Sequence, residues 1–276
     1  MKNKTLDNHR LNDKSVYIRQ SILEAIYHSG KGHIGGAFSC TDILVSLYYG
    51  GILKYDSKNP KWNQRDRFIL SKGHAAIALY AILADTGYYS SSELRLFNSG
   101  GLLGEHPDTN IPGIEINSGS LGHGLGVGAG MALAAKLDKK DYITYVLLGD
   151  GECYEGSIWE AAMFASHHNL DNLITIIDRN GLCIHGLTEE IIALDPLEKK
   201  FEAFGFSVTI INGHNFDEIL STLSSNKSKK PKLIIADTIK GKGVSFMENN
   251  ASWHHGEISD KVYKQAKKEL TKIRYH

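Results

Sequence analysis

The feature that most constrains this chain is a mainly apolar run, residues 142–148, that leads directly into Gly149-Asp150-Gly151. A short continuous run of this kind predicts a strand buried on both faces of a parallel sheet. Ligands of α/β sheets bind outside the carboxyl ends of such strands. A carboxylate there can hold a cation, and the glycine after it lets the backbone approach a phosphate closely. The sequence therefore predicts a ligand site that includes Asp150 and Gly151.

A second strand of the same kind, residues 173–178, ends just before Asn180, which follows Asp150 by thirty positions. The segment between the two strands has a helical pattern from about 157 to 168. Because parallel strands end at the same edge of a sheet, the carboxylate and the amide oxygen can converge. Mg²⁺ is commonly held by a few protein oxygens plus ligand phosphates. Gly-Asp-Gly alone is typical of an ordinary turn, but the spacing, both strands and the helix together indicate a metal site.

The alternation of strand and helix patterns predicts an α/β fold, a doubly wound parallel sheet with helices on both faces. Further strands are expected at 68–70, 207–211 and 233–238. The sequence contains no internal repeat and no linker that would divide it. We therefore expect residues 1–276 to form a single domain.

Helix ends are also readable from the sequence. A first helix is expected from about Asp13 to Ser29, with Gly30 as its C-cap. A second helix follows Ser39, whose hydroxyl can cap it. Glycines cluster in three segments, 30–36, 100–104 and 119–130, which we expect to be loops close to a ligand.

Composition excludes several classes of partner. Lys plus Arg equals Asp plus Glu, at 31 each, which gives no electrostatic case for nucleic acid or an acidic membrane surface. The three cysteines form no close pair and indicate a reducing compartment. No apolar stretch approaches the roughly 20 residues that span a bilayer, and residues 1–5 lack the apolar core of a signal peptide. We expect a soluble, cytoplasmic protein.

Four histidines lie beside or near glycines in loop-like segments: His33, His74, His106 and His255. A single histidine of this kind is more often a surface residue, but four of them favour a shared cleft. His123 lies in a similar segment. Zinc is a poor alternative, because no cysteine or histidine pair has the usual ligand spacing. A loose dinucleotide-type glycine pattern at 122–130 follows no strand, so a Rossmann interpretation is weak.

Taken together, these motifs resemble those of the N-terminal half of transketolase, and most closely the split kind in which the two halves are separate chains. The likeness covers nearly the whole sequence and includes the thiamine diphosphate signature. The segments that carry it are 30–36, 69–75, 119–125, 149–156, 178–182 and 238–243. The resemblance implies a thiamine diphosphate-binding fold with thiamine diphosphate and Mg²⁺ as cofactors, and with Ca²⁺ or Mn²⁺ as substitutes for Mg²⁺.

The resemblance also implies a role for individual residues. The metal would be bound by the Asp150 carboxylate, the Asn180 side chain and the Leu182 backbone carbonyl. The residues expected to contact the cofactor are His74, Gly119, Leu121, Gly151, Glu152, Asn180 and Ile184. The residues expected to take part in catalysis are His33, His74, His106, His255, Glu155 and Glu160. Of these, His33, His106 and His255 would face the sugar, whereas the two glutamates would lie at a subunit interface, in the carboxylate chain that links paired active sites.

Some positions depart from the family pattern. Ser120 and His123 stand in a loop that usually reads Gly-Pro-Leu-Gly-Gln-Gly, and His185 stands where aspartate is frequent. The pair His254-His255 has one histidine more than expected; either could meet substrate, and adjacency to glycine favours His255.

The resemblance further implies that this chain lacks part of the catalytic machinery. The glutamate that activates the cofactor pyrimidine, and the arginines that bind a sugar phosphate, belong to a following domain that the sequence ends before reaching. We therefore expect a complementary C-terminal subunit, an α2β2 assembly, and sugar or sugar-phosphate substrates that exchange a two-carbon ketol unit. Two alternatives stay open: a subunit of another thiamine enzyme, such as a deoxyxylulose-phosphate synthase or a 2-oxoacid dehydrogenase, and a non-catalytic regulatory half.

Overall fold

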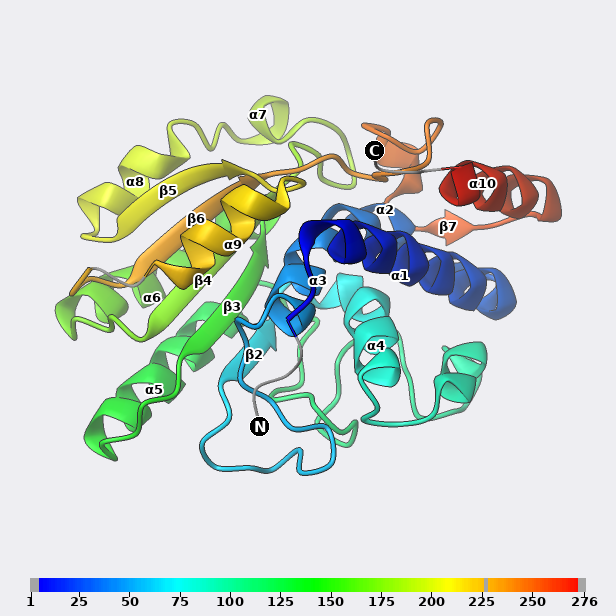
Figure 1. Cartoon of the computed structure of the whole chain (residues 1–276). Helices are drawn as coiled ribbons and strands as arrows, with labels where there is room; N and C mark the ends of the chain where they lie inside the picture. Colours follow the sequence, from blue (N-terminus) through cyan, green and yellow to red (C-terminus); the bar gives the residue numbers. More distant parts are fainter. Residues whose placement is uncertain (1–4, 226–227, 273–276) are drawn as a thin grey trace.

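A five-stranded parallel sheet forms the centre of the computed structural model, which describes residues 5–225 and 228–272 (Figure 1). The strand order is β2-β3-β4-β6-β5. The strands are β2 (Arg67–Leu70), β3 (Thr144–Gly149), β4 (Leu173–Arg179), β5 (Ser207–Asn212) and β6 (Lys232–Asp237). Gly149 pairs with Asp178, so β3 and β4 end at the same edge. The predicted α/β class and all five predicted strands are confirmed.

Both faces of the sheet are covered, as the alternation of buried side chains requires. In β3, Tyr145 and Leu147 belong to one core cluster, whereas Val146 and Leu148 belong to the other. The helices that pack on the first face are α1 (Asn8–Ser29), α3 (Thr41–Tyr49), α4 (Ala76–Asp85) and α9 (Phe216–Ser224). Those on the second face are α5 (His123–Leu137), α6 (Gly156–His167) and α8 (Leu197–Ala203). Strands β2, β3, β4 and β6 are therefore buried on both sides, which explains their almost uninterrupted apolar character, whereas the edge strand β5 is largely exposed.

The first helix begins earlier than the sequence pattern predicts. The Asp7 side chain accepts a hydrogen bond from the Arg10 backbone N–H and caps α1 at Asn8 rather than near Asp13. The other end is as predicted, because Gly30 adopts a φ of 84° as the C-cap.

Two local predictions were wrong. Ser39 is the last residue of the short helix α2 (Ile34–Ser39), and its hydroxyl binds the Gly36 carbonyl and Asp178 instead of capping α3. Two of the expected glycine loops are partly helical, because residues 34–36 begin α2 and residues 123–130 form the first half of α5. The glycines of α5 allow close packing: a Cβ on Gly128 would lie 2.4 Å from Cγ2 of Val146 in β3.

A small antiparallel pair joins two distant segments beside the main sheet. Strand β1 (Lys31–Gly32) pairs with β7 (Gly256–Glu257), and Gly32 lies opposite Gly256. This pairing places His33 and His255, the residues next to the paired glycines, on neighbouring chains. The last helix, α10 (Asp260–Lys272), follows and packs against α1 (Figure 1).

The remaining described elements are the helix α7 (Thr188–Ile191) and the short 3₁₀ turns 73–75, 91–96, 151–154 and 251–253. None of the helices within the described ranges combines the length and apolar character that a membrane crossing needs. Residues 1–4, part of the segment predicted to lack a signal core, lie outside the described residues.

Candidate active site

Asp150 and Asn180 line one cavity at the carboxyl edge of the sheet, as their positions after β3 and β4 predict. The cavity has a volume of about 240 Å³. Asp150 is almost fully buried, and its two oxygens accept hydrogen bonds from the N–H groups of Gly151 (2.8 Å) and Gly181 (2.6 Å). Burial, reinforced by the charge of Asp178, raises the pKa of Asp150. A nearby cation would therefore interact favourably with this carboxylate.

The Leu182 carbonyl, the third expected metal ligand, accepts a hydrogen bond from a lysine to which the sequence analysis gave no role. The Lys240 ammonium donates hydrogen bonds to the Leu182 carbonyl (3.0 Å) and to Nδ1 of His254 (2.8 Å). Burial and the charge of Lys72 lower the pKa of Lys240 to about 8. Lys240 follows β6, so a third strand end contributes to this cavity.

A buried network positions the segment that carries Lys240. His214 contacts Asp42 through Nδ1 (2.6 Å), and its Nε2 accepts a hydrogen bond from the N–H of Ile239 (2.8 Å). Asp42 in turn forms a two-bond pair with Arg19 (2.9 and 2.8 Å). No sequence signal pointed to a role for His214, because its partners are distant along the chain.

Lys72 is a second cation in the cavity wall. Its ammonium forms an ion pair with Asp178 and donates a hydrogen bond to the Gly36 carbonyl at 3.1 Å. Burial lowers the pKa of a lysine, but Asp178 outweighs this and raises the pKa of Lys72 to about 12. Lys72 is therefore charged at neutral pH, and the cavity offers both lysines to an anionic ligand.

Glu152 lies in the same cavity wall, but the protein itself engages both of its oxygens. Oε1 accepts hydrogen bonds from the Gly122 N–H (2.8 Å) and the Ser71 hydroxyl, and Oε2 accepts one from the Gly149 N–H (3.0 Å). Glu152 thus joins the ends of β2 and β3 to the start of α5. The arrangement supports a positioning role for this predicted cofactor residue.

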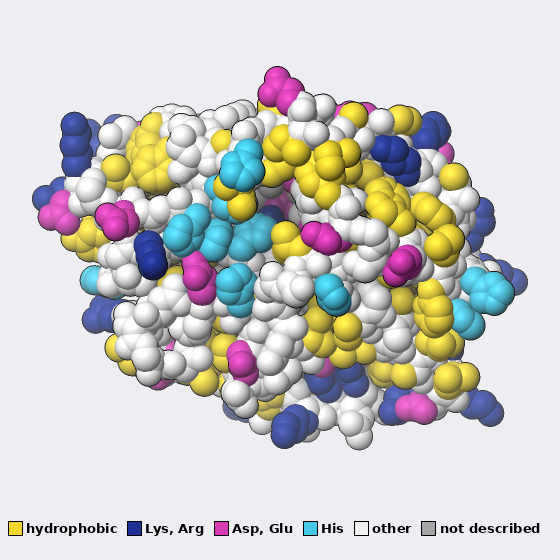
Figure 2. All heavy atoms as spheres, turned by 180° about the vertical axis from the view of Figure 1, so that it is seen from behind, with side chains coloured by type: hydrophobic (Ala, Val, Ile, Leu, Met, Phe, Trp, Pro, Cys, Tyr) yellow, Lys and Arg dark blue, Asp and Glu magenta, His cyan; other side chains and the backbone are white. Residues whose placement is uncertain are grey.

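The predicted histidines gather around His33. Its ring centroid lies 5.5 Å from that of His74, 6.3 Å from that of His106 and 4.4 Å from that of His255. His254 joins them at 5.4 Å. Histidine side chains are grouped around a hollow on this face of the molecule in Figure 2. The structure therefore brings together all four histidines that the sequence analysis placed in one cleft.

Burial keeps the inner histidines neutral. It lowers the pKa of His33 to about 4 and that of His254 to about 3, and it places the pKa of His74 well below the usual value. His255 lowers the pKa of His33 further, and Lys240 does the same for His254. A neutral imidazole has one donor and one acceptor nitrogen, so these rings can bind hydroxyl groups and exchange protons.

The two adjacent histidines occupy different depths. His254 lines the cavity and stacks on His74, with ring centroids 5.2 Å apart. His255 lies at the cavity mouth, where its Nε2 is 3.0 Å from Oε1 of Glu105. His254 therefore lies deeper in the cavity than His255.

The comparisons with known proteins agree with this geometry. Residues 12–272 match the family described as transketolase, thiamine diphosphate binding domain. The chain belongs to this family. It is 47% identical over 256 residues to one of the subunits of apulose-4-phosphate transketolase from Phocaeicola vulgatus, covering 92% of this chain and 91% of that protein. It is 44% identical to 6-deoxy-6-sulfo-D-fructose transketolase subunit SqwG of a Clostridium species, covering 95% and 96%.

Solved transketolases share the fold of this family member. The transketolase of Campylobacter jejuni superposes with a TM-score of 0.91 at 34% identity, over 98% of this chain. The match covers 44% of the Campylobacter chain, so the protein spans less than half the length of that solved relative. The predicted resemblance to transketolase and the predicted fold are confirmed.

The expected cofactor-ring residues of this transketolase-family chain also line the cavity. They are Gly119, Leu121 and Ile184, with Gly151 beside them. Gly119 has a φ of 137°, and a Cβ there would lie 3.0 Å from the His106 ring. A larger residue at 119 would therefore displace His106.

Several residues singled out from the sequence lie away from the cavity. Glu155 and Glu160 are exposed, at the start and along the outer side of α6. His185 is exposed, and His123 is exposed with Nδ1 3.0 Å from the Leu121 carbonyl. The structure does not bring the two glutamates to the histidines, and their role at a subunit interface stays a prediction.

Proposed function

We propose that this chain is the diphosphate- and metal-binding subunit of a two-chain transketolase, which transfers a two-carbon ketol unit from a ketose or ketose phosphate to an aldose acceptor. The observation that carries the proposal is the cavity in which Asp150, Asn180 and the Leu182 carbonyl meet two lysines and a histidine cluster. Two relatives of similar length are named as transketolase subunits, which supports the division into two chains.

The donor atoms at the sheet edge fit a hard divalent cation. Asp150, Asn180 and the Leu182 carbonyl offer oxygen atoms only, which suits Mg²⁺ and would also accept Ca²⁺ or Mn²⁺. The raised pKa of buried Asp150 supports a cation as its natural partner. Gly151 and His74 would contact the diphosphate, while Lys72 and Lys240 would supply positive charge beside it.

Bound thiamine diphosphate supplies a centre that stabilises a carbanion during ketol transfer. The residues of this chain would bind and orient the sugar. Neutral His33, His74 and His254, together with His106, can donate and accept hydrogen bonds at sugar hydroxyls and carry protons between them. His255 and Glu105 would meet the part of the sugar nearest the cavity mouth.

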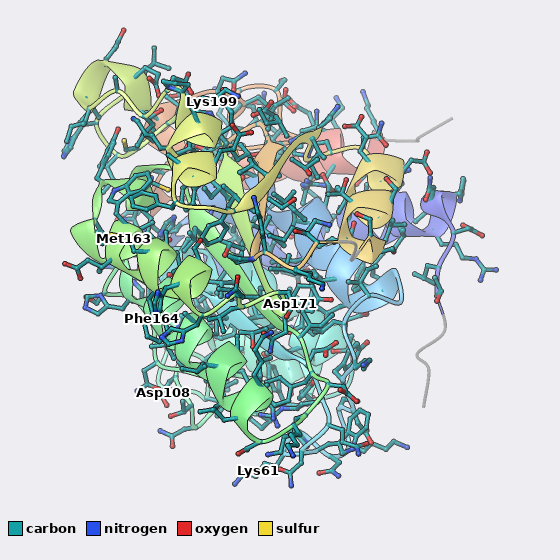
Figure 3. All side chains as sticks on the ribbon, turned by 90° about the vertical axis from the view of Figure 1, so that its left-hand side faces the viewer. Lys61, Asp108, Met163, Phe164, Asp171 and Lys199 are labelled. Carbon is teal, nitrogen blue, oxygen red and sulfur yellow. The ribbon has the colours of Figure 1, made fainter. Side chains whose placement is uncertain are left out.

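An exposed apolar surface supports the proposed partner chain. Met163 and Phe164 project from the outer side of α6, and their exposed fractions are 54% and 40% (Figure 3). Further exposed apolar side chains are Val127, Ile184, Leu187, Ile191 and Ile192. Hydrophobic side chains gather over one side of the view in Figure 2, and monomeric proteins rarely expose large contiguous apolar patches. We infer that residues 1–276 form one domain, and that complementary chains cover this face in an α2β2 assembly and supply the pyrimidine-binding domain.

The proposal is tested by mixing this chain with its complementary chain in the presence of thiamine diphosphate, Mg²⁺, a ketose phosphate and several aldehyde acceptors. We expect ketol transfer in the mixture and none with either chain alone. A mixture that binds the cofactor without transferring a ketol unit would instead favour another thiamine chemistry or a regulatory half. Decarboxylation of a 2-oxoacid by the same mixture would identify the former.

The depth of the two adjacent histidines gives a sharper test within the same assay. His254→Ala should lower kcat strongly because it removes a ring that stacks on His74 and contacts Lys240. His255→Ala should act mainly on KM because it lies at the mouth. If His255→Ala lowers kcat and His254→Ala acts mainly on KM, then His255 contacts the substrate, as its position next to a glycine predicts.

A further inference from the structure

A second group of potential ligands lies at the cavity mouth, separate from the oxygen atoms of Asp150 and Asn180. Oε1 of Glu105 lies 3.2 Å from Nδ1 of His33 and 3.0 Å from Nε2 of His255. One ligand atom from each of the three residues lies within 4.8 Å of the others. With metal–ligand bonds of about 2.0–2.2 Å, a tetrahedral zinc site places its ligand atoms roughly 3.3 Å apart. The two separations that involve Glu105 are close to that value, and the two histidine nitrogens lie within 4.8 Å of each other.

The chemistry of the group also suits a transition metal. Nδ1 of His33 is buried and makes no hydrogen bond to any described residue, so the contact with Glu105 leaves it unsatisfied. A buried nitrogen without a partner is costly, and a metal bond would satisfy it. Two imidazole nitrogens and one carboxylate oxygen favour Zn²⁺, whereas Mg²⁺ prefers oxygen ligands alone. The two candidate sites thus differ in the metal that they select.

The fold holds these ligands in place from three segments. His33 and His255 follow from the β1–β7 pairing, in which Gly32 lies opposite Gly256. Glu105 comes from the loop before Pro107, and the same three residues line a hollow of about 480 Å³ at the mouth. Glu105 and His255 are about one-third exposed, so a fourth position facing solvent is left for water.

We propose that His33, Glu105 and His255 form a Zn²⁺ site that closes the mouth of the cavity. His33 belongs both to this group and to the cavity wall, so a metal ion on it would occupy space that the substrate needs. Zn²⁺ would therefore inhibit the enzyme while Mg²⁺ remains on the oxygen ligands. The inhibitory consequence rests on the proposed transketolase function, but metal binding itself does not.

Metal binding is tested on this chain alone by calorimetric titration with ZnCl₂, in excess Mg²⁺ so that the oxygen ligands are occupied. We expect one strong site, and we expect Glu105→Gln and His255→Ala each to weaken it more than about tenfold, because loss of even an indirect metal-site residue commonly costs that much. The control is His28→Ala, which removes an exposed histidine 3.8 Å from Glu24 and should leave the affinity unchanged. Equal Zn²⁺ affinity in wild type, Glu105→Gln and His255→Ala would overturn the site.

Inhibition is tested separately in the two-chain assay. Zn²⁺ should inhibit ketol transfer by the wild-type mixture, and His255→Ala should raise the inhibitory concentration by at least about tenfold. If Zn²⁺ inhibits that variant as strongly as wild type, the proposal that a Zn²⁺ ion at the mouth blocks the cavity is wrong. If the mixture transfers no ketol unit at all, the proposed function fails, while the titration still decides whether the metal site exists.

Discussion

The Lys240 ammonium lies 3.0 Å from the Leu182 carbonyl oxygen, which is also an expected ligand of the metal ion. The same ammonium lies 2.8 Å from Nδ1 of His254. Lys240 therefore connects an expected metal ligand to the histidine cluster. A cation at this point should attract the diphosphate of the cofactor and orient His254 with Nδ1 as an acceptor.

Replacing Lys240 with methionine should weaken binding of the Mg²⁺ complex of thiamine diphosphate by about tenfold or more, because a hydrogen bond to a charged group contributes about 1.5–3 kcal/mol. Calorimetric titration of the chain alone would measure the change. Lys242→Met is the matched control, since Lys242 lies in the same turn but pairs loosely with Glu248 at 3.8 Å. Equal losses in the two variants would show that only general charge matters.

Asp150→Asn should abolish Mg²⁺-dependent retention of the cofactor. Asparagine preserves the size of the side chain but removes the charge, and only one of its two terminal atoms can accept the N–H bonds from Gly151 and Gly181. Gel filtration with thiamine diphosphate, with and without Mg²⁺, would measure retention. Asp171→Asn, which changes a half-exposed carboxylate paired with Lys136, serves as the control, and undiminished retention by Asp150→Asn would remove the metal-site assignment.

The buried pair of Arg19 and Asp42 should give stability that depends on pH. Burial alone would raise the pKa of Asp42, but the Arg19 guanidinium and the hydrogen bond with His214 hold it well below its usual range. Asp42 is therefore charged in the folded protein at a pH where the unfolded chain already binds a proton. Its contribution to stability is complete above about pH 4, the usual value for aspartate, and is lost as the pH falls further.

Asp42→Asn tests this directly by urea unfolding. At pH 7 the free energy of unfolding of the variant should be about 3–5 kcal/mol lower than that of wild type, because Arg19 stays buried without the Asp42 charge. This difference in the free energy of unfolding should persist down to about pH 4 and become smaller below that pH. The surface pair of Lys136 and Asp171 provides the control, since breaking an exposed pair costs at most about 1 kcal/mol. A difference that stays constant at pH 3 would contradict the assigned charge state.

Local sequence patterns predicted the strands and the meeting of Asp150 and Asn180 at one sheet edge, because each depends on a few adjacent residues. The run before Gly149 is buried throughout, and Asp150 must follow it at the sheet edge. The same reasoning failed at α5, because glycines usually indicate loops. Helix α5 contains Gly124 and Gly128 because it packs so closely on β3 and on the residue after β2 that a Cβ at either position would have no room.

Long-range pairs could not be predicted from spacing. Glu105 lies 150 residues from His255 along the chain, and His214 lies 172 residues from Asp42. Zinc looked improbable from the sequence because no pair of potential ligands had the usual separation, and it became a candidate only when β1 and β7 placed His33 beside His255. Lys240 lies in segment 238–243, which carries the family resemblance, but its role could not be assigned until its partners Leu182 and His254 were known.

The glycines of α5 provide a test of this packing argument within one helix. Gly128→Ala should destabilise the chain, because its Cβ would lie 2.4 Å from Cγ2 of Val146. Valine in a buried strand cannot move aside easily, and overpacking of a core costs about 1–3 kcal/mol. Gly130→Ala is the matched control, since a Cβ there meets nothing within 4 Å.

The control should have the opposite sign. Alanine is favoured over glycine inside a helix by about 0.5–1 kcal/mol, so Gly130→Ala should raise the free energy of unfolding of the isolated chain. Urea unfolding of both variants, followed by circular dichroism, measures the two changes. If both substitutions stabilise the chain to the same extent, close packing of α5 on β3 is not the reason for glycine at 128, and helix α5 must lie farther from the sheet than the structure places it.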